Sequence, residues 1–183
     1  MGIPAPTLIF GQSLGEYSAL CQANYLSQTE AMSLLEYRSE LIAETPPAKM
    51  ILVKCKNDNA IIILPSGIEL STRLSKSSLV FVGDPLVIED HFKMLKLAGV
   101  ECRLLKTTHG FHSSRLVHIK ERIRSKAESI LFSSERMEVS AEVISNLDGE
   151  ILDASRVNAE YLAEHLIQPV RLDLAMKMFV FTN

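Results

Sequence analysis

Residues 11–15 read G-Q-S-L-G, and this pattern constrains how the start of the chain can fold. An apolar run at 7–10 precedes the pattern, and E-Y-S-A-L follows it at 16–20. The glycines on either side of the serine permit a sharp turn because glycine lacks a Cβ atom. The sequence therefore predicts a strand, a tight turn at Ser13 and then a helix.

This strand–turn–helix arrangement has two interpretations. In a nucleophile elbow, the turn presents a serine hydroxyl at the N-terminus of the helix. A glycine-bounded turn without catalytic meaning is the alternative, because a five-residue pattern of this kind often arises by chance. The remaining motifs have to distinguish between the two.

Size and composition narrow the class of protein. The 183 residues allow one sizeable core, or a core with a small subdomain. The net charge of −3 argues against a nucleic acid or a membrane surface as partner. Three widely spaced cysteines without C-x-x-C predict buried thiols in a reducing compartment. No segment resembles a signal peptide or a membrane span, so we expect a cytoplasmic protein.

Local signals predict most of the helices and strands. S-Q-T-E at 27–30 is a capping box, and Pro46-Pro47 ends the helix that follows it. Asp84-Pro85 and Gly99 bound another helix. The further elements that we expect are strands at 50–55, 60–64, 78–82, 100–106, 142–145 and 150–153, and helices at 70–75, 114–131, 158–167 and 170–181.

Arg38 stands out because it falls within the apolar stripe of the helix that follows the capping box. A guanidinium on a core-facing position is costly unless an anion meets it. The residues alone leave two explanations open. Arg38 either binds an anionic ligand, or it reaches the surface and pairs with a local carboxylate such as Glu36 or Glu40.

A serine nucleophile needs a base, and histidine is the usual one. His91 and His118 lie in predicted amphipathic helices, which indicates ordinary surface or boundary residues. His109 and His112 lie in a polar loop, where catalytic residues concentrate, and His165 lies in a late helix. No Cys/His cluster has zinc spacing, so we expect neither a metal nor another cofactor.

Three motifs in the right order resemble one family. Residues 11–20 are similar to the G-H-S-L-G-E-Y-S-A-L elbow of malonyl-CoA:acyl-carrier-protein transacylases and polyketide synthase acyltransferase domains. H-G-F-H-S at 109–113 resembles their H-A-F-H-S loop, and H-L-I-Q-P-V-R at 165–171 resembles their H-L-x-x-P-V-R motif. Arg38 falls where the family has its substrate arginine, and the resemblance spans essentially the whole chain.

The resemblance implies a Ser–His dyad. Ser13 would attack the thioester of an acyl-CoA, and His112 would act first as general base and then as general acid. The main-chain carbonyl of His165 would orient the base, and the backbone N–H of Leu14 would be one oxyanion donor. The acyl group would then pass to the phosphopantetheine thiol of an acyl carrier protein.

The resemblance also implies the acyl group. Arg38 would bind the free carboxylate of a malonyl group, and Phe111 favours a small C2 substituent, because a bulky loop of this type accompanies malonyl in the family. Gln12 replaces the usual histidine before the serine, so it would alter the substrate pocket. The family's P-G-Q-G loop, which supplies a second oxyanion donor, has no match before Gly11.

The implied fold is an α/β-hydrolase-like acyltransferase core with an inserted ferredoxin-like α+β subdomain. We expect the core at 1–47 and 108–183 and the insertion at 48–107. We also expect the core to be truncated at both ends, so other domains or chains would complete it.

The sequence therefore predicts an acyltransferase that moves malonyl from CoA to a carrier protein in fatty-acid or polyketide biosynthesis. Two alternatives stay open: an acyl-thioester hydrolase of the same fold, and a non-catalytic remnant that binds a carrier protein. Arg38 speaks against the hydrolase, whereas Gln12 and the missing ends favour the remnant.

Overall fold

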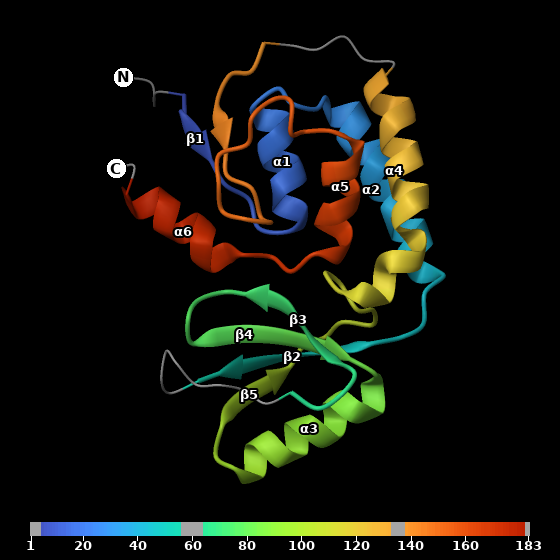
Figure 1. Cartoon of the computed structure of the whole chain (residues 1–183), viewed down its shortest axis with the longest axis vertical. Coiled ribbons are helices and arrows are strands. Elements are labelled where there is room, and N and C mark those ends of the chain that lie inside the picture. Colours follow the sequence, from blue (N-terminus) through green and yellow to red (C-terminus); the bar gives the residue numbers. More distant parts are fainter. Residues whose placement is uncertain (1–4, 56–63, 133–137, 182–183) are drawn as a thin grey trace.

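A computed structural model describes residues 5–55, 64–132 and 138–181. Helices dominate one part of the molecule, and a four-stranded sheet with one helix forms the other (Figure 1). The helical part contains β1 (Leu8–Ile9), α1 (Leu14–Gln22), α2 (Gln28–Ala43), the 3-10 turn η1 (Ser114–Leu116), α4 (Val117–Phe132), β6 (Glu142–Val143), α5 (Ala159–Ile167) and α6 (Leu172–Phe181). The sheet part contains β2 (Lys49–Lys54), β3 (Ile68–Arg73), β4 (Ser78–Gly83), α3 (Pro85–Leu97) and β5 (Glu101–Leu104).

The predicted strand, turn and helix at the start of the chain are present. β1 pairs in parallel with β6, with Leu8 opposite Glu142 and Ile9 opposite Val143. The strand has two residues rather than the four expected, and α1 begins at Leu14, directly after Ser13. The β1–β6 pairing brings the serine turn beside a segment from late in the chain.

The capping box starts α2 as predicted. Ser27 Oγ accepts a hydrogen bond from the main-chain N–H of Glu30, and Glu30 Oε2 accepts one from the N–H of Ser27 at 2.6 Å. Arg38 follows Leu34 by four residues and precedes Leu41 by three, so it lies with them on the buried face of the helix. Arg38 is only 3% exposed, as its place in the apolar stripe predicted.

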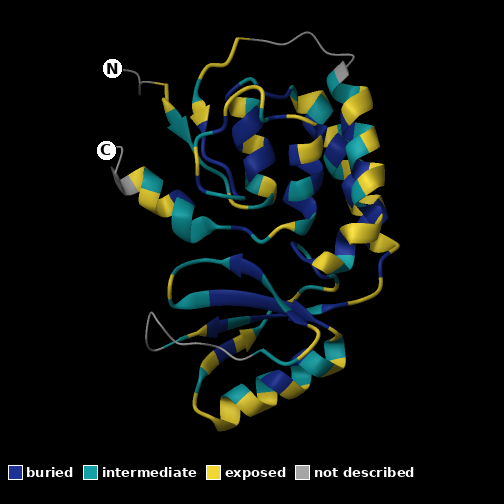
Figure 2. Cartoon of the chain, in the orientation of Figure 1, coloured by how far each residue is buried: buried dark blue, intermediate teal, exposed yellow. Residues whose placement is uncertain are grey.

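The four-stranded sheet is antiparallel, in the order β3-β4-β2-β5, and it has two distinct faces. Successive residues of a strand point to opposite faces. Leu79 and Phe81 of β4 belong to the cluster that packs with α3, whereas Val80 and Val82 belong to a second cluster that includes Phe111. Figure 2 shows β4 as a largely buried strand and the outer side of α3 as exposed. The face opposite α3 is therefore available to line a site.

Two elements expected in the sheet part of the molecule are not confirmed. One prediction is wrong, and the other lies almost entirely outside the described residues. The helix predicted at 70–75 is wrong, because residues 68–73 form β3 and pair with β4. An isolated helix of six residues is unstable in water, so the ladder with β4 prevails over local preference. The strand predicted at 60–64 lies outside the described residues, apart from Leu64, which is not in a strand.

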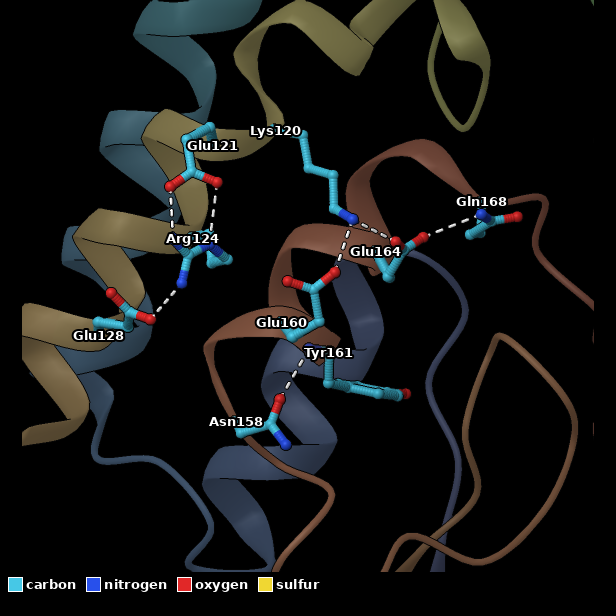
Figure 3. A network of polar contacts seen from close by, with 9 residues as sticks. All are labelled: Lys120, Glu121, Arg124, Glu128, Asn158, Glu160, Tyr161, Glu164 and Gln168. Atoms are coloured by element: carbon cyan, nitrogen blue, oxygen red, sulfur yellow. Dashed lines mark hydrogen bonds and ion pairs between the residues drawn. The ribbon is translucent and has the colours of Figure 1, made fainter.

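Ion pairs join α4 to α5, the helix that carries His165. Lys120 on α4 pairs with Glu160 at 2.6 Å and with Glu164, both on α5 (Figure 3). At the start of α5, Asn158 Oδ1 accepts a hydrogen bond from the N–H of Tyr161 at 3.0 Å (Figure 3). Apolar packing of Leu116, Ile119 and Ile123 against Ala163 and Leu166 completes this contact. Ion pairs and apolar packing thus hold α5 against α4.

The late P-V-R segment links the two parts of the molecule. Val170 donates a hydrogen bond from its N–H to the carbonyl of Ser71 and accepts one from the N–H of Arg73, at 2.9 and 2.8 Å. Both partners lie in β3, so this segment joins the edge of the sheet to the helical core. The next residue, Arg171, donates its N–H to the carbonyl of Asn146 at 2.7 Å.

The remaining general expectations concern cysteines and membranes. Cys21, Cys55 and Cys102 are all free thiols, but only Cys102 is buried, so the expectation of three buried thiols is partly wrong. Within the described ranges, every helix is too short or too polar to cross a membrane.

Candidate active site

Ser13 and His112 meet although they are 99 residues apart in the chain. The Ser13 Oγ lies 2.7 Å from His112 Nε2, and His112 Nδ1 lies 3.1 Å from the main-chain oxygen of His165. A carbonyl oxygen can only accept, so Nδ1 carries the proton and donates it to this oxygen. Nε2 is then the acceptor that faces the serine hydroxyl. The structure thus brings together three of the residues that the sequence singled out.

Both members of this pair have an unusual backbone conformation. Ser13 has φ 53° and His112 has φ 54°, in the left-handed region that residues with a side chain seldom occupy. Such strain persists only where the surroundings impose it, and it concentrates at functional sites. Ser13 is also the N-cap of α1, but its hydroxyl forms no capping hydrogen bond, which leaves it for His112.

Asn146 holds the strained serine turn in place. Its Oδ1 accepts a hydrogen bond from the N–H of Ser13, and its Nδ2 donates one to the carbonyl of Gly11, each at 2.7 Å. The residue is fully buried just after β6, between the strands that the sequence predicted at 142–145 and 150–153. One amide side chain therefore clamps the backbone on both sides of Gln12.

Glu16 holds Asn146 in place by accepting hydrogen bonds from it. The main-chain N–H of Asn146 donates to Glu16 Oε2 at 2.7 Å, and its Nδ2 contacts the same oxygen. The hydroxyl of Tyr161 donates to Glu16 Oε1 and lies 3.0 Å from Ser145 Oγ. Burial raises the pKa of Glu16 to about 7, although these hydrogen bonds act in the opposite direction.

Sequence reasoning missed both Asn146 and Glu16 as site residues. The available signal was the position of Glu16 in α1, since Tyr17, Ala19 and Leu20 around it are all buried apolar residues. A carboxylate on such a face needs several donors, and the structure supplies them.

Arg38 approaches the same site from α2. Its Nη1 lies 3.4 Å from His165 Nδ1, and its Cζ lies 5.9 Å from the centroid of the Tyr17 ring. Among the described residues, no carboxylate forms an ion pair with Arg38, so the pairing with Glu36 or Glu40 is absent. The buried cation is therefore unneutralised.

Burial and this cation set the charge of the two histidines. Burial, and next the positive charge of Arg38, lower the pKa of His112 to about 3. The same two causes hold the pKa of His165 well below its ordinary value. Both rings are consequently neutral at pH 7, and His112 is in the form that can accept a proton.

A cavity of about 610 Å³ opens on these residues between the helical core and the sheet. Its walls come from α2, from the loop before η1 and from the sheet face opposite α3. The exposed surface of the lining is mostly apolar, although half of its residues are polar or charged, and it comprises Gln12, Ser13, Leu14, Leu35, Arg38, Ser39, Ile42, Ala43, Met50, Thr72, Val80, Leu105, Thr107, His109, Phe111 and His112. This combination is typical of a pocket for a small organic ligand.

The other predicted site residues lie as follows. Gln12, Leu14 and Phe111 all line the cavity. Leu14 is the first residue of α1, where main-chain N–H groups have no partner within the helix. His109 also lines the cavity, but its Nδ1 contacts Thr108 Oγ1 at 2.9 Å rather than the serine.

The two histidines expected at the surface differ from each other. His118 is exposed, whereas His91 is only 5% exposed, so the expectation of a surface or boundary position is wrong for His91. Burial lowers the pKa of His91. Across the part of the chain that the structure describes, His, Cys, Asp and Glu side chains form no cluster suited to a metal ion.

Comparison with known proteins places the chain in a family. The family model described as "Acyl transferase domain" matches residues 1–181. A non-reducing polyketide synthase of Nectria, ntnG, is 31% identical over 180 residues, which cover 94% of this chain and 9% of that protein. The polyketide synthase terA of Aspergillus terreus is 30% identical over 177 residues, with coverage of 94% and 8%. The chain thus belongs to the acyl transferase domain family and spans about a tenth of these relatives.

Solved structures show the same fold. The acyltransferase domain from the second module of the salinomycin polyketide synthase has a TM-score of 0.81 and 26% identity, covering 96% of this chain and 41% of that one. The malonyl CoA-acyl carrier protein transacylase of Burkholderia pseudomallei has a TM-score of 0.84 and 22% identity, covering 98% and 62%. The predicted acyltransferase core with a ferredoxin-like subdomain is confirmed.

Proposed function

We propose that this chain is an acyltransferase that moves a malonyl group from malonyl-CoA to the phosphopantetheine thiol of an acyl carrier protein. The observation that carries the proposal is the 2.7 Å contact between Ser13 Oγ and His112 Nε2 beside a buried, unneutralised Arg38. Support also comes from the transacylase and polyketide synthase names of the relatives. The reaction would serve fatty-acid or polyketide biosynthesis.

In the first half-reaction, Ser13 Oγ attacks the thioester carbonyl while His112 Nε2 takes the hydroxyl proton. The main-chain N–H of Leu14 would donate to the oxyanion, because the serine N–H is already bound to Asn146. The C–S bond then breaks, and His112 returns the proton to the departing CoA thiolate. This step leaves a malonyl ester on Ser13.

In the second half-reaction, the carrier-protein thiol takes the place of CoA. His112 would remove the thiol proton, the thiolate would attack the ester, and the proton would return to Ser13 Oγ. The carbonyl of His165 keeps the imidazole in one tautomer through both halves. Because His112 is neutral at the start of each half, it can act as base twice without an external proton.

Arg38 would select the acyl group. A malonyl carboxylate would neutralise a cation that has no anionic partner among the described residues, whereas an acetyl group would leave it unpaired. Phe111, which lines the cavity and packs against Val80 and Val82, would restrict the space for a C2 substituent. Gln12 would contribute a hydrogen-bonding group that cannot carry charge.

The proposal extends to organisation and location. We divide the chain into a core at 1–47 and 108–183 and an inserted subdomain at 48–107, with other domains or chains completing the core. We place the reaction in the cytoplasm, and the three free thiols are consistent with a reducing compartment.

Covalent labelling tests the proposal. The folded chain is incubated with radiolabelled malonyl-CoA and quenched, and protein-bound label is measured. We expect label in the wild type and in Ser18→Ala, a control at an exposed serine of α1, but none in Ser13→Ala. Label that carrier protein then removes supports a transferase. Label released only to water indicates a thioester hydrolase, and a folded wild type without label indicates a non-catalytic module.

A further inference from the structure

His165 contacts the site through two different groups. Its main-chain oxygen accepts the hydrogen bond of His112, and its ring reaches in another direction, toward Arg38. The ring is 1% exposed. A guanidinium has only donors, so at 3.4 Å the Nδ1 atom of His165 must be the acceptor for Arg38 Nη1. The proton of the neutral ring is then on Nε2.

The surroundings of Nε2 favour the same tautomer. This atom has no hydrogen-bond partner among the described residues, and Oε2 of Glu16 lies 3.9 Å from it. A proton on Nε2 at this distance is stabilised by the carboxylate charge when Glu16 is ionised. Glu16 itself is fixed by Asn146 and Tyr161. Both sides of the His165 ring therefore favour a proton on Nε2, and the contact with Arg38 orients the ring.

The guanidinium of Arg38 is bounded by this ring and by Tyr17. Arg38 Cζ lies 5.9 Å from the Tyr17 centroid, and the Tyr17 and His165 rings meet edge to face with centroids 5.6 Å apart. A long side chain held by one acceptor and one aromatic face loses most of its rotamer freedom before a ligand arrives. Its remaining N–H groups can then meet a carboxylate without further ordering.

We propose that the imidazole of His165 is a positioning residue for Arg38 and thereby sets the preference for a carboxylated acyl group. This inference rests on the proposed function. The two groups of one residue would have separate effects: the main-chain oxygen orients the base for every substrate, and the ring orients the cation for malonyl alone. A substitution at 165 keeps the oxygen and changes only the ring.

The test compares acylation of Ser13 by malonyl-CoA and by acetyl-CoA. His165→Phe keeps a ring without an acceptor, and we expect the malonyl-to-acetyl rate ratio to fall about tenfold, the loss typical of a charge-assisted hydrogen bond. His165→Asn keeps an acceptor near the Nδ1 position and should restore most of the ratio. His91→Phe is the matched control, because that ring is buried, has no hydrogen-bond partner within the described ranges and lies outside the cavity.

An unchanged ratio in folded His165→Phe, or an equal fall of both rates, would overturn the proposal. A second measurement decides the matter if the wild type forms no acyl ester or if His165→Phe does not fold. ¹⁵N NMR of the histidine rings should show His165 neutral, protonated on Nε2, with an Nδ1 resonance that shifts in Arg38→Met. A proton on Nδ1, or no shift in Arg38→Met, contradicts the proposal even where the proposed function itself has failed.

Discussion

Asn146 Oδ1 accepts a hydrogen bond from the main-chain N–H of Ser13 at 2.7 Å, across 133 residues of sequence. The same side chain binds the carbonyl of Gly11, so it bridges the turn that holds the serine at φ 53°. Without the bridge, the backbone can relax toward an ordinary conformation.

Asn146→Ala should therefore lose both stability and acylation. The change removes the partner of the half-buried Ser13 N–H and Gly11 carbonyl and one of the donors to Glu16, and we expect the unfolding free energy to fall by about 3 kcal/mol. Displacement of Ser13 Oγ should slow acylation about a hundredfold. Urea denaturation and the labelling rate measure the two effects. Asn158→Ala, at the exposed N-cap of α5, is the control and should cost about 1 kcal/mol of stability with little effect on rate.

The two glycines of the elbow should respond differently to alanine. A Cβ atom on Gly11 would lie 2.0 Å from the carbonyl oxygen of Gly15, whereas one on Gly15 would meet nothing within 4 Å. We expect Gly11→Ala to lower the unfolding free energy by about 3 kcal/mol or more. Gly15→Ala lies within α1 and should raise it by about 0.5–1 kcal/mol. Similar effects of the two substitutions in thermal or urea unfolding would contradict the close approach at Gly11.

Acylation should retain its rate into acid. Because burial and Arg38 lower the pKa of His112 to about 3, the ring remains an acceptor well below pH 6. We expect the malonyl-CoA labelling rate to stay flat between pH 7 and about 5. A rate that halves near the ordinary histidine pKa of about 6.5 would show that His112 is not protected in this way. Circular dichroism over the same range verifies that the chain remains folded.

Glu16 should make a contribution to the unfolding free energy that decreases as the pH rises. Its pKa is raised to about 7 in the folded chain, so the folded state holds a proton that the unfolded state has lost between about pH 4.5 and 7. Stability from this group therefore falls as pH rises through that window. Relative to the wild type, Glu16→Gln should gain roughly 3 kcal/mol of unfolding free energy between pH 4.5 and 7. A constant difference between the two proteins in urea unfolding at several pH values would rule out the raised pKa.

Arg38→Met should lose malonyl selectivity and gain stability. The cation is buried without a carboxylate partner in the described residues, so an apolar replacement removes a desolvation cost, and we expect about 1–3 kcal/mol more unfolding free energy. The malonyl-to-acetyl ratio should fall about a hundredfold. Arg122→Met, an exposed arginine paired with Glu44, should change neither quantity appreciably. A destabilised Arg38→Met would instead assign Arg38 a structural role.

Local signals explain which parts of the fold the sequence predicted. The Ser27–Glu30 capping box and the Asp84 cap with Gly99 act within a few residues, so they can be read without tertiary structure. By contrast, β3 at 68–73 exists because of its ladder with β4 and its contact with Val170, and neither is visible in its own residues. Strand formation there depends on partners rather than on propensity.

The same distinction applies to the site. Motifs identify Ser13, His112 and His165, and the apolar stripe of its helix identifies Arg38. The structure brings all four together, while their functional roles stay predictions. Asn146 was not identified as a site residue because N-L-D-G at 146–149 is also a good turn sequence. Nothing in these residues shows that the amide of Asn146 binds the N–H of Ser13. A clamp formed across such a sequence distance becomes apparent only in three dimensions.

The parallel pairing of β1 with β6 has a consequence for how the protein is made. During synthesis, the serine turn leaves the ribosome long before Glu142 and Val143, the residues that pair with β1. Vectorial folding can complete the sheet with β2 to β5 early, since its strands are close in sequence, but the elbow must wait for residue 146 and the base for residue 165. In a nascent chain, the contacts among Ser13, His112, Asn146 and the carbonyl of His165 can therefore form only after residue 165 has left the ribosome.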